Sequence, residues 1–168
     1  MKKCLLTVTA LIVAALPCWA RLGETEEQSI ARYGQPIRTF HTAIKGEVRH
    51  DYWKDYFLVK AIFFQGACCS ISFKKAVSPD EAYKGPGIKF TEAEEKLLLD
   101  QNNQGHSWTK AADDGGGDVW SRDDGGDAVV IGAFFCIDSP EFGALAKLAK
   151  AANQNADAAA AQKSVGGL

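Results

Sequence analysis

Aspartates and glycines gather in two short segments, and these residues are the ones most suggestive of metal chemistry. The segments cover residues 113–118 and 123–127, and they contain Asp113, Asp118, Asp123 and Asp127. Calcium binds several oxygen atoms that converge on one point, which clustered carboxylates can supply. Neither segment has the full spacing of a calcium loop, and tight turns require the same two residue types. The pattern favours two turns and no cofactor, with a metal site at these four aspartates as the alternative.

Cysteine is the second residue type that could do chemistry. Cys68, Cys69 and Cys136 lie beyond the N-terminal twenty residues, and because their number is odd at most two can pair. One interpretation is a disulfide that joins Cys136 to Cys68 or Cys69, and the other is three small core residues. A thiol nucleophile is disfavoured, because Cys68 and Cys69 sit in a strand-like run rather than in cationic surroundings.

The remaining catalytic residue types form no recognisable motif. His41, His50 and His106 are the only histidines, and none lies in a metal-binding pattern. The sequence contains no Gly-x-Ser-x-Gly elbow and no phosphate-binding loop. We therefore expect a non-enzymatic protein.

Large aromatic residues among charges indicate a binding surface instead. The segment from His50 to Tyr56 holds three aromatic side chains between alternating charges, a composition typical of binding hot spots. The alternative is that these side chains simply pack into a sheet. The candidates for partner contact are Tyr52, Trp53, Tyr56, Trp108 and Trp120.

The first twenty residues have the pattern of an export signal. Lys2 and Lys3 precede an apolar run, Pro17 ends it, and Ala20 completes a cleavage site. Cleavage would leave 17 basic and 21 acidic residues in a periplasmic or secreted chain. An acidic chain is a poor partner for nucleic acid. The sequence contains no second long apolar segment, so we expect no membrane span after cleavage. The expected partner is another envelope or secreted protein.

Helix and strand signals repeat along the chain. Thr25 and Thr91 each begin a capping box, so we expect one helix up to Tyr33 and another from residue 92 to about 101. Strands are expected at residues 37–43, 56–64 and 67–75, and again at 107–112, 119–122 and 128–137. A two-residue turn at Gln65-Gly66 would place Ile62 opposite Cys69 and Leu58 opposite Phe73, which leaves Lys60 on an otherwise apolar face. A turn centred on Asp114 would place Trp108 opposite Trp120.

These elements predict an α+β fold of two tandem repeats, each with one helix packed on a three-stranded antiparallel sheet, plus a C-terminal helix. The last helix would begin after Ser139, with Pro140 in its first turn. The expected organisation is a signal peptide at 1–20, a first unit at 21–75, a linker at 76–89, a second unit at 90–138, a C-terminal helix at 139–152 and a disordered tail at 153–168.

Residues 23–28, followed by Gly34-Gln35-Pro36, resemble the helix signature of the small outer-membrane-assembly lipoproteins. Their pattern is Gly-x-Thr-x-x-Gln and then Gly-x-Pro, before a meander of strands. The wider superfold includes the secreted β-lactamase inhibitor proteins, which carry two tandem helix-plus-sheet units and grip an enzyme with an aromatic-rich concave sheet. The resemblance implies a protein-binding module of this layout. The alternatives are an inhibitor of a secreted hydrolase, and a small ligand-binding domain or enzyme.

Overall fold

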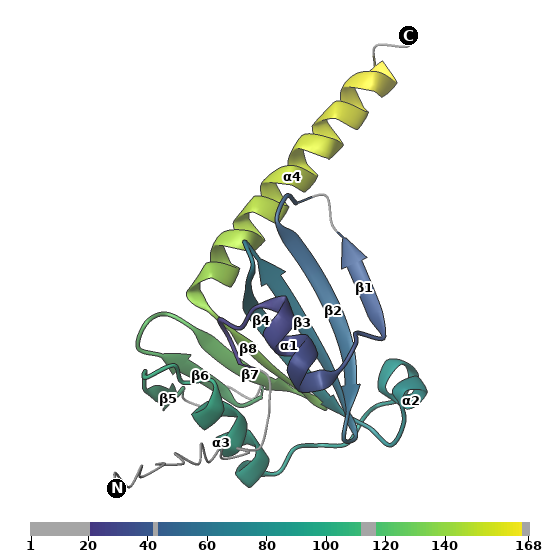
Figure 1. Ribbon diagram of the computed structural model, residues 1–168. Helices are drawn as coiled ribbons and strands as arrows, with labels where there is room; N and C mark the ends of the chain where they lie inside the picture. Colours follow the sequence, from purple (N-terminus) through teal and green to yellow (C-terminus); the bar gives the residue numbers. More distant parts are fainter. Residues whose placement is uncertain (1–20, 42–43, 112–116, 166–168) are drawn as a thin grey trace, which may run out of the picture.

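The protein folds around one antiparallel sheet of eight strands (Figure 1). The computed structural model describes residues 21–41, 44–111 and 117–165. The strands lie in the order β1-β2-β3-β4-β8-β7-β6-β5. Their bounds are β1 Arg38–His41, β2 Glu47–Lys54, β3 Phe57–Phe64, β4 Ala67–Lys75, β5 Trp108–Lys110, β6 Val119–Arg122, β7 Asp127–Ile131 and β8 Phe134–Asp138. The helices are α1 Glu26–Tyr33, α2 Pro79–Lys84, α3 Glu92–Gln101 and α4 Pro140–Val165.

The α+β class is confirmed, but the two separate three-stranded sheets are not. Each half of the chain supplies four strands, and β4 pairs with β8 so that the halves form one continuous sheet. The first extra strand is β2, which contains most of the aromatic segment from His50 to Tyr56. The second arises because the stretch 128–137 turns back at Gly132-Ala133, where Ile131 pairs with Phe134. The positive φ of Gly132, 63°, suits the first position of such a two-residue turn.

Both capping boxes form as the sequence predicts. The Thr25 hydroxyl accepts from the backbone N–H of Gln28, and Thr91 does the same for Glu94. Gly34 then ends α1 with a positive φ of 84°. The caps fix where α1 and α3 begin and so fix which residues of each helix face the sheet.

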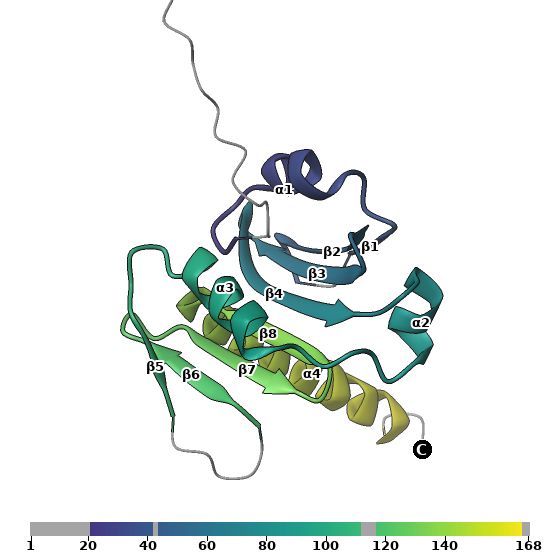
Figure 2. The same cartoon turned by 90° about the horizontal axis from the view of Figure 1, so that it is seen from below.

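The main core lies between one face of the sheet and the helices α1 and α3, which lie apart on it (Figure 2). Alternate residues of the inner strands point into it, as the period of a strand requires, whereas all four residues of the edge strand β1 are exposed. Its fully buried large side chains include Tyr52, Phe63, Phe73 and Phe135. On the other face, α4 contacts β4 and β8, and its Leu145 is buried. The helices therefore cover both faces.

The turn at Gln65-Gly66 is confirmed, but the strand register that we predicted beyond it is wrong. Both turn residues have positive φ, 54° and 87°, and Phe63 pairs with Cys68 as a two-residue turn requires. A β-bulge follows, so that Ile62 pairs with Ser70. The same shift places Leu58 opposite Lys74 rather than Phe73, and Lys60 opposite Ser72. The extra residue at Cys69 moves every later pair by one position.

Two segments are more ordered than the sequence predicts. The linker at 76–89 contains α2, which Ser78 caps and Pro79 begins. The helix α4 does not stop near residue 152 but continues to Val165, across most of the expected disordered tail. Alanine has the highest intrinsic helix propensity, so an alanine-rich segment can extend a helix without an apolar face to bury. Residues 166–168 lie outside the described part.

The predicted export signal at 1–20 also lies outside the described residues. Within the described part of the chain, none of the helices combines the length and apolar character needed to cross a membrane. α4 is long, but polar and charged residues recur along it.

Candidate functional groove

The five aromatic candidates do not form one surface. Tyr52 is fully buried in the core, with its ring 5.2 Å from that of Tyr33. Trp53, the next residue of β2, points to the opposite face and packs beside Leu58. Tyr56 is 65 % exposed in the turn between β2 and β3. Burial excludes Tyr52 as a direct contact. Tyr52, Trp53 and Tyr56 therefore do not form the single contact surface that the sequence predicted for the first half of the chain.

The two tryptophans of the second half do line one groove. Trp108 of β5 and Trp120 of β6 border a hollow of about 560 Å³ that α3 closes on its other side. Trp108 is half-buried, whereas Trp120 is only 8 % exposed. We call this hollow the α3 groove. It is lined by Glu92, Glu95, Lys96, Leu99, Asp100, Asn103, His106, Ser107, Trp108, Lys110 and Trp120.

The pairing of β5 with β6 places both tryptophans on the core-facing side of the hairpin, at diagonal positions rather than directly opposite each other. Trp108 pairs with Arg122, and Lys110 pairs with Trp120. The expected direct pairing of the two tryptophans is wrong, because the hairpin is centred one residue later than the turn residues suggested. Each ring instead lies under a cation, since the Arg122 guanidinium carbon is 5.4 Å from the Trp108 ring centroid and Lys110 Nζ is 5.4 Å from that of Trp120.

The helix α3 fixes the position of Trp108 directly. The Trp108 indole Nε1–H donates a hydrogen bond of 2.9 Å to the backbone carbonyl of Leu99. That carbonyl belongs to the last turn of α3 and also accepts from the backbone N–H of Asn102 at 3.1 Å. The tryptophan therefore adds a second hydrogen bond at the end of the helix and joins the helix to β5.

Charges in the α3 groove are unevenly matched. Lys110 Nζ lies 2.7 Å from Asp118 Oδ1, and this hydrogen bond raises the pKa of the lysine. Lys96 pairs with Asp100 at 2.6 Å. Glu95, by contrast, is only 9 % exposed, and burial raises the pKa of its carboxyl. The groove thus contains a buried acid beside tryptophan rings.

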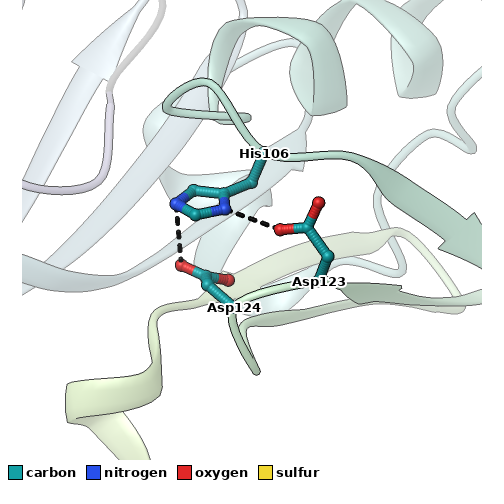
Figure 3. A group of neighbouring side chains, drawn as sticks. All are labelled: His106, Asp123 and Asp124. Carbon is teal, nitrogen blue, oxygen red and sulfur yellow. Dashed lines mark hydrogen bonds and ion pairs between the residues drawn. The ribbon is translucent and has the colours of Figure 1, made fainter.

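A second cluster, His106 with Asp123 and Asp124, lies at the turn between β6 and β7 (Figure 3). His106 Nδ1 is 2.6 Å from Asp123 Oδ1, and its Nε2 is 3.7 Å from Asp124 Oδ2. Ser107 N–H donates to the other oxygen of Asp123 at 3.0 Å. Arg122 donates to both oxygens of Asp124 at 2.7 Å, which lowers the pKa of that carboxyl to about 2. Since every carboxylate oxygen here already accepts a bond, the cluster holds the turn to the start of β5.

The three described aspartates of the metal alternative, Asp118, Asp123 and Asp127, do not form one cluster. Asp118 pairs with Lys110, Asp123 with His106, and Asp127 lies in β7 opposite Asp138. Asp113 lies outside the described residues. The structure therefore separates the three that it describes, because each belongs to a different turn or strand.

The strand register contradicts the expected disulfide between Cys136 and Cys68 or Cys69. Cys136 pairs with Ser72, three positions along β4 from Cys69, which corresponds to a separation of about 10 Å. A disulfide needs Cα atoms closer than about 7 Å. Cys68 lies in the core, and all three thiols are free. Burial raises the pKa of Cys69 and Cys136 to about 11, so both thiols are protonated at neutral pH.

Another hollow, of about 610 Å³, lies between the turn of β3 and β4 and the start of α4. Its charged lining residues include Arg122 and Asp124, which bond to each other. The α3 groove differs in having a largely buried acid, Glu95, without an ion-pair partner among the described residues. Sequence reasoning missed Glu95, although Glu95 precedes the buried Leu98 and Leu99 by three and four positions and so shares their face of the helix.

Comparison with protein-family models, with curated proteins and with solved structures finds no significant match to this chain.

Proposed function

We propose that this chain is an exported, non-enzymatic protein-binding module and that the α3 groove is its contact surface. The observation that carries the proposal is that two of the five candidate aromatics, Trp108 and Trp120, line the same open groove. Tryptophan supplies more contact energy at interfaces than most residues, because it buries a large rigid area while its N–H stays polar. Export is suggested by residues 1–20 and stays a prediction, as do the tandem repeat and the resemblance to the outer-membrane-assembly lipoproteins.

A peptide-selection experiment tests the proposal without knowledge of the partner. The chain from Arg21 to Leu168 would be used to select binders from a library of random peptides. Selected peptides should bind at least tenfold more weakly to Glu92→Lys, which changes the charge on the rim of the α3 groove. The matched control is Glu27→Lys, which makes the same change in the first turn of α1, away from the groove. Peptides that bind both variants equally, or no enrichment at all, would overturn the proposal.

A second candidate function, inhibition of a secreted hydrolase, is favoured by Tyr56. Its side chain is 65 % exposed at a two-residue turn, and its φ of 71° is rare for a tyrosine. The Tyr56 carbonyl accepts from Ala76 N–H at 2.9 Å, which holds the turn in place. A rigid turn with an exposed aromatic side chain suits insertion into an enzyme cleft. Inhibition of any secreted hydrolase in a panel should fall with Tyr56→Ala, and an unchanged inhibition constant would reject this role for Tyr56.

A further inference from the structure

Glu95 is a buried acid without a bonding partner. It is only 9 % exposed and it lines the α3 groove. Among the residues that the structure describes, no hydrogen-bond donor or cation bonds to its carboxylate. Its carboxylate oxygens are not among the buried polar atoms that lack a hydrogen-bond partner, so they reach the open groove, where solvent contacts them. The wall of the groove therefore presents an unpaired, largely buried acid that a cation entering the groove can contact.

The lysines of the groove do not form an ion pair with Glu95. Lys110 Nζ is bound to Asp118 at 2.7 Å, and Lys96 Nζ is bound to Asp100 at 2.6 Å. Glu92, on the same helix, has no ion-pair partner among the described residues either. Since each lysine already has its own acid, two glutamates of the groove remain unmatched.

We propose that the α3 groove binds a basic side chain, lysine or arginine, of the partner protein, with Glu95 as its counter-ion. The inference rests on the proposed function and names the chemistry of the partner at that site. Arg122 and Lys110 already lie over the rings of Trp108 and Trp120, so the tryptophans contribute apolar contact for the stem of the incoming side chain rather than a free ring face for its charge. An arginine suits the site especially, since its planar guanidinium can donate two hydrogen bonds to one carboxylate.

Burial is the main cause of the raised pKa of Glu95, and the charges of neighbouring groups add to it or oppose it. Glu92 and Glu94 of α3 and Asp118 before β6 disfavour ionisation of Glu95, while Lys110 of β5 favours it. Asp100, Lys96 and His106 are the other titratable groups of the groove. A bound cation favours the ionised form of Glu95. Binding should therefore release a proton near the raised pKa, and it should weaken as the pH falls through that value.

A titration with two small probes tests the inference on the chain from Arg21 to Leu168. The indole N–H signals of Trp108 and Trp120 would be followed by NMR during addition of N-acetylargininamide or its uncharged analogue N-acetylcitrullinamide. The arginine probe should shift both signals at pH 7, with at least tenfold higher affinity than the citrulline probe. Glu95→Gln, which keeps the shape of the side chain, should remove that preference. The control Glu27→Gln should keep it.

The outcomes separate this inference from the proposed function. Equal affinity for the two probes, or an arginine preference that survives in Glu95→Gln, overturns the role of Glu95. If library peptides bind the α3 groove but carry no basic residue at a common position, the cation inference fails while the protein-binding proposal stands. If neither peptides nor probes bind there, both fail.

Discussion

Asn102 connects the two halves of the chain, and its replacement is the sharpest test of the fold. Its side chain is fully buried at the end of α3. The Oδ1 atom accepts from Leu22 N–H at 3.0 Å, and Nδ2 donates to the Leu98 carbonyl at 2.9 Å. Asn102→Leu keeps a similar volume and removes both bonds.

The two lost bonds have different consequences. The Leu98 carbonyl keeps the backbone N–H of Asn102 at 3.2 Å, so its loss is that of one ordinary hydrogen bond, about 1 kcal/mol. Leu22 N–H has no such substitute, and a buried donor without a partner costs about 1–3 kcal/mol. The free energy of unfolding should therefore fall by about 2–4 kcal/mol, a large share of the total of about 5–15 kcal/mol for a typical domain.

Urea unfolding followed by tryptophan fluorescence measures this difference. The matched control is Asn103→Leu at the next position, where the side chain is half-exposed and Oδ1 accepts only from Gly105 N–H at 3.1 Å. That substitution should cost less than about 1 kcal/mol. If Asn102→Leu costs no more than the control, the buried bond to Leu22 does not contribute as the geometry indicates.

Three further predictions follow from charges and thiols. Glu95→Gln should raise the free energy of unfolding at pH 7 but not at pH 3, because burial raises the pKa of Glu95 and wild-type stability falls as the pH rises through it; an equal effect at both pH values in denaturant unfolding would contradict this. Asp124→Asn should cost about 1–2 kcal/mol at pH 7 and clearly less at pH 2, because the bonds from Arg122 lower the Asp124 pKa to about 2 and their stabilisation is lost as the pH falls from 3.8 through about 2; a pH-independent loss would assign the effect to packing. Mass spectrometry of the unreduced chain from Arg21 to Leu168 should show three free thiols, and Cys136 should react slowly with iodoacetamide at pH 8 because its pKa is about 11; rapid labelling would mean that the thiol is more accessible than the structure shows.

Local signals in the sequence predicted the local features of the fold. The caps at Thr25 and Thr91, and the turn at Gln65-Gly66, depend on neighbouring residues alone, and all three form as expected. The missed strand β2 also carried a signal, because Val48, His50 and Tyr52 alternate with charged residues. Those charged residues, Glu47, Arg49 and Asp51, suggested a loop. They lie on the face of the sheet opposite the main core, where polar side chains can be accommodated.

Features that depend on distant contacts were beyond sequence reasoning. The bulge at Cys69 shifts the register only once β3 and β4 are paired, and no residue type marks it in advance. The groove depends on α3 lying against β5 and β6, so only the structure shows that Glu95 and Trp120 border the same space. The continuous sheet depends on the pairing of β4 with β8, which brings together segments from opposite halves of the chain.

That pairing has a consequence for the order of assembly. The last strand to be synthesised, β8, lies at the centre of the sheet, and both of its neighbours precede it in the sequence. Until residue 138 becomes available, β4 and β7 each present an unsatisfied row of backbone groups, which invites aggregation. A chain that ends before β8 therefore lacks the strand that joins its two halves into one sheet.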